Sequence, residues 1–129
     1  MTLNIKELNK IGYKLKMEQV QIEMARVLDD VINIIETYHS LELKVDEGMT
    51  YSKLLKNLSS NLFYLERYRS EYYYKHNQIM FEFKGSVAAS KIKADEQVPE
   101  IYLLRRTMNA AYRVADAMRS NISYIKKEQ

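Results

Sequence analysis

The chain has 129 residues with three glycines, one proline and no cysteine, which excludes a disulfide framework and a thiolate metal site and favours long helices with few turns. No apolar run approaches the roughly 20 residues that cross a bilayer, and the first residues lack the apolar core of a signal peptide, so we expect one domain in the cytoplasm. The net charge is only +3, but an acidic segment, residues 17–50, precedes a basic one, residues 51–94, and this asymmetry either steers an anionic partner to one surface or pairs neighbouring helices.

The beginning of the chain is predicted to form a short helix. Asn4 and Glu7 have the spacing of a capping box, in which side chains satisfy the first backbone N–H groups of a helix. Gly12 can end such a helix, because glycine readily adopts the left-handed conformation that often follows a last turn. We therefore expect a first helix within residues 1–12.

A long helix is predicted next, over residues 13–45. Its apolar residues alternate at spacings of three and four, which is the heptad pattern of a helix that packs against other helices. The members of this seam are Met17, Val20, Met24, Val27, Val31, Ile34, Tyr38 and Leu41. The polar segment Asp46–Thr50 interrupts the pattern, and Thr50 can cap the helix that follows.

A second long helix is predicted over residues 50–84. The apolar members of its seam are Tyr51, Leu55, Leu58, Leu62, Leu65, Ile79 and Phe83. Between Leu65 and Ile79 the same period lands on Arg69, Tyr72 and His76, where leucine would be expected. Gly85 is the predicted end of this helix.

The last third of the chain is predicted to hold a connection and a third long helix. Residues 85–98 are the least regular part, and we interpret them as a connection with room for a short helix. Pro99 suits the first turn of a helix over residues 99–127. Backbone N–H groups of the first turn have no acceptor within the helix, so the missing N–H of proline costs no hydrogen bond there. The seam of this helix, which we assign to self-association, is Ile101, Leu104, Met108, Ala111, Ala115, Met118, Ile122 and Ile125. Its two alanines allow a partner helix to approach closely.

The predicted fold class is all-α, a helical hairpin or bundle of three long helices and a short one. Regular heptad seams suit either a monomeric bundle or a homo-oligomer, and periodicity alone does not separate the two. A chain of 129 residues in such long helices would be elongated, so we expect its seams to find partners on other subunits.

No motif in the sequence indicates an enzyme. There is no cysteine, no Gly-x-Ser-x-Gly nucleophile elbow, no phosphate-binding loop and no Gly-rich dinucleotide motif. Glu36 and His39 have the Glu-x-x-His spacing of di-iron bundles, but the second such pair that these sites need is missing. We therefore predict a protein without catalytic activity, cofactor or bound metal.

Tyrosine and basic residues concentrate in the segment Tyr64–Asn77, which holds five of the eleven tyrosines. Arg67 and Tyr74 lie opposite the apolar seam of the predicted helix, whereas Arg69 continues that seam. An amphipathic helix normally has one apolar and one polar side. Two interpretations follow. The side chains fill an end of the bundle that water enters, or they contact a nucleic acid strand through arginine–phosphate pairs and stacking of bases on tyrosine.

Three stretches in the second half of the chain are similar, in the same order, to those of one known family. They are RYRSEYY at Arg67–Tyr73, KIKADEQVPEI at Lys91–Ile101 and RSNISYIK at Arg119–Lys126. They resemble, in turn, the basic-x-Arg-x-acid-Tyr-Tyr stretch, the segment before the C-terminal helix and the close of that helix in the UvsY recombination mediators of T4-type phages. The family usually has Ser-Gly where this chain has Tyr74 and Lys75.

The resemblance implies a small homo-oligomeric accessory factor, not an enzyme, that binds single-stranded DNA and helps load a phage recombinase onto strands covered by single-strand binding protein. In that family two basic positions, here Arg67 and Arg69, are associated with DNA binding, and the C-terminal helix carries assembly. The candidate nucleic-acid-binding residues are Arg67, Tyr68, Arg69, Tyr72, Tyr73, Tyr74 and Lys75. The alternative is a helical protein–protein adaptor or virion-assembly protein without nucleic-acid binding, because its seams and charge blocks would look the same.

Overall fold

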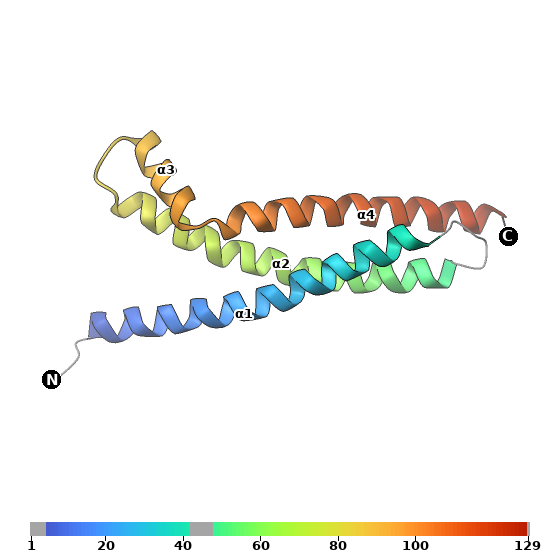
Figure 1. Cartoon of the computed structure of the whole chain (residues 1–129), viewed down its shortest axis with the longest axis horizontal. Coiled ribbons are helices and arrows are strands. Elements are labelled where there is room, and N and C mark those ends of the chain that lie inside the picture. The colour runs from blue at the N-terminus through green and yellow to red at the C-terminus, as the bar shows by residue number, and fades with distance from the viewer. Residues whose placement is uncertain (1–4, 42–47, 129) are drawn as a thin grey trace.

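The computed structural model describes residues 5–41 and 48–128, and the described chain is all-α, as predicted. The helices are α1 (Ile5–Ser40), α2 (Gly48–Glu82), α3 (Val87–Gln97) and α4 (Glu100–Glu128) (Figure 1). The predicted cap at Asn4 and most of the predicted break at Asp46–Thr50 lie outside the described residues. No helix in the described part of the chain is long and apolar enough to cross a membrane.

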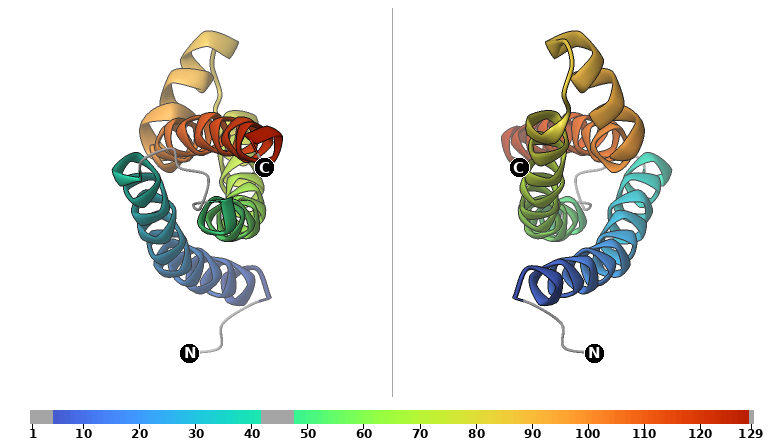
Figure 2. Two further views of the ribbon diagram at one scale, coloured as in Figure 1. Left: turned by 90° about the vertical axis from the view of Figure 1, so that its right-hand side faces the viewer. Right: turned by 90° about the vertical axis from the view of Figure 1, so that its left-hand side faces the viewer.

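Helix α2 lies antiparallel to both α1 and α4, and α3 packs on the C-terminal part of α2 (Figure 1). Seen along the long axis of the molecule, α1 crosses the α2–α4 pair at an angle, and α3 projects from the opposite side (Figure 2). Helix α2 contacts each of the other three helices, so it is the central element of the fold.

Helix α1 passes through Gly12 without a break, so the prediction of a separate short helix over residues 1–12 was wrong. A glycine ends a helix by taking a positive φ, and no glycine in the described part of the chain does so. A Cβ atom added at Gly12 would meet nothing within 4 Å. The glycine therefore costs this exposed part of α1 about 0.5–1 kcal/mol relative to alanine, and the helix continues.

The predicted connection at residues 85–98 contains a full helix, α3, of 11 residues. Ser86 caps its first turn, and the Ser86 Oγ accepts a hydrogen bond of 3.1 Å from the backbone N–H of Ala89. Ala94 is completely buried, so α3 has one side that packs against the rest of the chain although its apolar residues are few and irregularly spaced. Val98 caps the end of α3, and α4 begins at Glu100, directly after Pro99.

The hydrophobic core is formed by one side of each long helix. In the middle of α1 the buried residue is Leu28, whereas its neighbour Val27, which belongs to the predicted seam, is half-buried. In α2 the core includes Tyr68, Tyr72 and His76 in addition to the leucines of the seam. The heptad pattern therefore predicted the inward sides of these two helices to within one residue.

The seam of α4 lies in the core of the single chain, which corrects its assignment to self-association. Seven of its eight members are buried and the eighth, Ile122, packs against them: Ile101, Leu104, Met108, Ala111, Ala115, Met118, Ile122 and Ile125. Ala111 and Ala115 are 0% and 1% exposed, so the close approach that small residues permit occurs within the chain. The periodicity was interpreted correctly as a contact side, but the helices that cover it are the chain's own.

Two adjacent leucines of α4 test the rotation of this helix. Leu104 is 0% exposed and Leu103 is 49% exposed. We expect Leu104→Ala to lower the free energy of unfolding by about 2–5 kcal/mol, because it leaves a cavity in the core. Leu103→Ala should change it by no more than about 0.5 kcal/mol. Urea unfolding followed by helical circular dichroism measures both, and equal losses would contradict the burial of the α4 seam.

Candidate nucleic-acid interface

The seven residues predicted to bind nucleic acid point in three different directions from α2. Tyr68 and Tyr72 point inward and are 6% and 2% exposed. Their rings are part of the hydrophobic core and are not available to stack on bases while the helices are packed. Their assignment to the interface was therefore wrong, because the heptad seam continues through this segment with tyrosine in place of leucine.

Arg67 points toward α1, where it lines a groove of about 470 Å³ between α1 and α2. Arg26, Glu23 and Asp30 of α1 line the same groove. Two carboxylates thus accompany two guanidinium groups, and the groove has no clear excess of positive charge. A phosphate would meet repulsion there as well as attraction.

Lys75 and Tyr74 also lie on the α1 side of α2. Lys75 lines a second cavity, of about 310 Å³, together with the carboxylates Glu18 and Glu100. Tyr74 is 54% exposed, and its ring meets Tyr13 edge-on at a centroid distance of 6.3 Å. These residues fill the joint between α1 and α2, so they fit the structural interpretation of the segment better than the nucleic-acid one.

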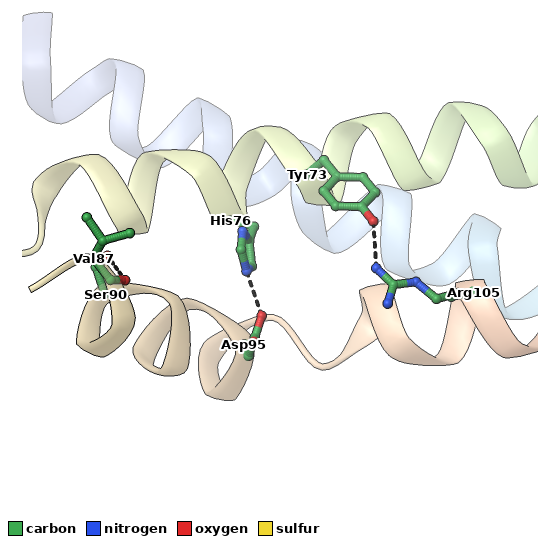
Figure 3. A network of polar contacts seen from close by, with 6 residues as sticks. All are labelled: Tyr73, His76, Val87, Ser90, Asp95 and Arg105. Atoms are coloured by element: carbon green, nitrogen blue, oxygen red, sulfur yellow. Dashed lines mark hydrogen bonds and ion pairs between the residues drawn. The ribbon is translucent and has the colours of Figure 1, made fainter.

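Arg69 and Tyr73 point to the other side, toward α4. Two residues apart on a helix corresponds to a rotation of about 200°, so Arg67 and Arg69 cannot serve the same groove. The Tyr73 hydroxyl accepts a hydrogen bond of 2.9 Å from Nη2 of Arg105 on α4 (Figure 3). This bond raises the pKa of the Arg105 guanidinium, which keeps its positive charge fixed at the α2–α4 joint.

Two further contacts extend this polar joint along α2. At one end the Tyr112 hydroxyl donates a hydrogen bond to the Glu66 carboxylate, and this bond raises the pKa of Tyr112. At the other end the His76 Nε2 lies 2.8 Å from Oδ1 of Asp95 on α3 (Figure 3). The contacts hold α3 and α4 against α2, and they leave the outward side of α4 uncovered.

The outward side of α4 is a cationic surface, and the sequence analysis missed it. We call it the basic face of α4. Its basic members, all exposed, are Arg105, Arg106, Arg113, Arg119, Lys126 and Lys127. Asp116 is the one acidic residue between Ile101 and Lys127. Three tyrosines stand among these cations, and Tyr102, Tyr112 and Tyr124 are 64%, 40% and 50% exposed.

The charges of the basic face are largely unpaired within the described part of the chain. Of its six cations only Arg119 forms an ion pair there, 3.0 Å from Oδ1 of Asp116 in the same helix. The Arg106 guanidinium lies 5.7 Å from the ring centroid of Tyr102, a cation–π contact that keeps the ring flanked by positive charge. An exposed ion pair such as that of Arg119 with Asp116 is weak, so the cations of this face remain available to an anionic partner.

The sequence contained a signal for this face. The seam of α4 was identified correctly, and the residues opposite a known seam form the solvent side of the helix. The net charge of residues 95–129 is only +1 and hides this signal, because Asp95, Glu96, Glu100 and Glu128 lie at the ends of that segment and offset the cations between them.

Comparison with known proteins gives no match: no family model, no curated protein and no solved structure is significantly similar to the chain. The resemblance to the UvsY mediators therefore stays a prediction. Among the described residues, no three histidine, cysteine or acidic side chains gather in a way that would hold a metal ion. The candidate interface rests on the geometry of α2 and α4 alone.

An alkaline titration tests whether Tyr72 belongs to the core. Burial, followed by the Glu100 carboxylate and Tyr13, raises the pKa of Tyr72 from 10.0 to about 12. The folded state thus holds this proton more tightly than the unfolded chain. The resulting stabilisation is complete below pH 10.0 and is lost as the pH rises toward about 12.

We expect the phenolate absorbance of the wild type to include a late phase near pH 12. Tyr72→Phe should remove this phase, whereas the control Tyr124→Phe, which removes the hydroxyl of an exposed tyrosine, should leave it at full amplitude. A Tyr72→Phe variant that keeps the late phase would contradict the burial of Tyr72.

Proposed function

We propose that this protein binds single-stranded nucleic acid along the basic face of α4. The observation that carries the proposal is that six exposed cations and three exposed tyrosine rings of α4 lie outside its buried seam, with Asp116 as the one acidic residue between Ile101 and Lys127. Proteins that bind single strands without sequence preference combine these two elements, cations that follow the backbone and rings on which bases stack. The resemblance to the UvsY mediators favours DNA as the strand.

The face has the dimensions of an extended site. Arg105 and Lys127 are separated by 22 residues, which corresponds to about 33 Å along a helix. Cations along this length would neutralise several successive phosphates and release their counterions, so affinity should fall as the salt concentration rises. Stacking on an exposed tyrosine contributes about 1–3 kcal/mol per base and requires bases that are not paired in a duplex.

Two of the residues predicted from the sequence remain in this proposal. Arg69 and Tyr73 lie at the joint of α2 with α4, and the bond between Tyr73 and Arg105 links them to the basic face. Tyr68 and Tyr72 contribute only by holding α2 in the core. Arg67, Tyr74 and Lys75 lie on the α1 side and are outside the proposed site.

The mediator role is the part of the proposal that rests on the resemblance. It describes a protein that assists a phage recombinase in replacing single-strand binding protein on DNA. The long helical surface is compatible with such an accessory role. Its partners would be single-stranded DNA, the recombinase and single-strand binding protein.

A charge-matched pair of variants locates the site. Arg113→Gln, Lys126→Gln and Lys127→Gln together remove three cations from the basic face. We expect weaker binding to a fluorescent poly-dT strand, and a salt slope that is lower by up to about 2, since each phosphate contact on a single strand contributes about 0.7. Fluorescence anisotropy over a salt series measures both, with a duplex of equal length expected to bind less well than the strand.

The control removes the same charge elsewhere. Lys53→Gln, Lys56→Gln and Arg67→Gln together neutralise three exposed cations of α2 that are not on the basic face, so binding should stay close to that of the wild type. A larger loss of affinity in this control would place the site on α2 instead. A wild type that does not bind the strand in low salt would refute the proposal.

The mediator role has its own measurement. We expect the protein to shorten the lag before a phage recombinase begins DNA-dependent ATP hydrolysis on strands already covered by single-strand binding protein. The triple variant of the basic face should lose this effect together with DNA binding. Binding to the bare strand without any change in the lag would leave the protein a DNA-binding protein and exclude the mediator role.

A further inference from the structure

The cavity of about 310 Å³ beside Lys75 lies where three helices meet. Helix α1 supplies most of its lining, including Tyr13 and Met17, α2 supplies Tyr72 and Lys75, and α4 supplies its first residue, Glu100. Its volume is at the lower end of the range for pockets that bind small molecules. None of the residues that line it belongs to the basic face of α4.

Two polar atoms of the lining residues lack a partner. The Tyr13 hydroxyl and Oε2 of Glu100 are both shielded from solvent, and neither has a hydrogen-bond partner among the described residues. Buried polar groups in native proteins nearly always have such a partner, because each of them gave up hydrogen bonds to water on folding. Two exceptions at one cavity indicate that the partner is a molecule from outside the chain.

The chemistry of these atoms defines the partner. Burial, followed by the Glu100 carboxylate and Tyr13, raises the pKa of Tyr72 to about 12, so the Tyr72 hydroxyl lies within electrostatic reach of both. Oxygen atoms from three helices thus gather at this cavity. An ionised carboxylate only accepts hydrogen bonds, so the missing partner is a donor. A positive charge fits best, because both the carboxylate and the faces of the phenol rings attract it.

The chain's own cations do not occupy this position. Lys14 and Lys75 line the cavity and are exposed, and neither ammonium reaches Oε2 of Glu100. Glu18, also exposed, lies one helical turn from Lys14 and offsets its charge. The exposed part of the lining therefore keeps the positive charge of Lys75, which repels a second cation, whereas the buried part holds the Glu100 carboxylate.

We propose that this cavity binds a small organic monoamine. The ammonium group donates hydrogen bonds to Oε2 of Glu100 and to the Tyr13 hydroxyl. The hydrocarbon part lies against Met17 and the Tyr72 ring, which are 8% and 2% exposed and form an apolar wall. The bound amine joins α1, α2 and α4. This site is independent of strand binding by the basic face of α4, so either proposal stands if the other fails.

A titration with n-butylammonium chloride, followed by the backbone amide signals in nuclear magnetic resonance, tests the site. We expect saturable shifts at Tyr13, Tyr72 and Glu100, with a dissociation constant on the order of 1 mM, because so small a ligand offers few contacts. n-Butanol, which has the same chain without the charge, should bind at least about tenfold more weakly. Butane-1,4-diamine should bind no more tightly than n-butylammonium.

Variants identify the atoms that hold the amine. Glu100→Gln keeps the shape of the side chain but removes its charge, and it should raise the dissociation constant about tenfold or more. The matched control Glu128→Gln removes the same charge from the exposed far end of α4 and should leave the constant unchanged. Because Glu100 lies in the first turn of α4, where a carboxylate stabilises the helix, Tyr13→Phe on α1 provides a second test and should weaken binding about threefold.

Three results would overturn the proposal. Shifts that do not saturate, or that equal concentrations of sodium chloride reproduce, would mean that the cavity holds water only. Equal affinity for n-butanol would mean that it selects an apolar chain without recognising the ammonium. Tighter binding of the diamine, or equal weakening by Glu128→Gln and Glu100→Gln, would exclude a monoamine held by Glu100. Circular dichroism verifies that each variant keeps its helices.

Discussion

The burial of one side of α4 is the constraint on which the candidate interface depends. Leu104, Met108 and Met118 are 0%, 1% and 0% exposed, and turning any of them into water would cost about 1.5–3 kcal/mol. The core therefore fixes the rotation of α4. With the rotation fixed, the arginines and lysines between the seam positions have only the solvent side left to them. The concentration of positive charge on that side is a consequence of how the core is packed.

The parts of the fold that sequence could predict are those that depend on periodicity. The inward sides of α1, α2 and α4 follow from apolar spacing, because a side chain at the wrong phase would face water along the whole helix. The same spacing explains why Tyr72 and His76 are buried even though they are polar. Their positions in the heptad decide their direction, and their chemistry decides only which hydrogen bonds they make.

The remaining features depend on information that spacing does not contain. A seam shows that something covers a helix, but not whether the cover is the same chain, and for this reason the α4 seam was assigned to other subunits. Gly12 was interpreted as a stop because glycine permits one, whereas the exposed helix simply continues through it. Arg67 and Arg69 were joined into one site because they are close in sequence, although the helix turns them to different neighbours.

The central position of α2 determines how the chain loses its structure. Helices α1, α3 and α4 each pack on α2, and among these three only α1 and α4 have a substantial contact with one another. Within the described residues, a disturbance that melts α2 therefore removes the largest contact of α1, α3 and α4 at once and leaves mainly the smaller contact between α1 and α4. The chain should therefore unfold as one cooperative unit. Helix α3 is short and packs on α2 through one side only, so we expect its backbone amide protons to be the first to exchange with water.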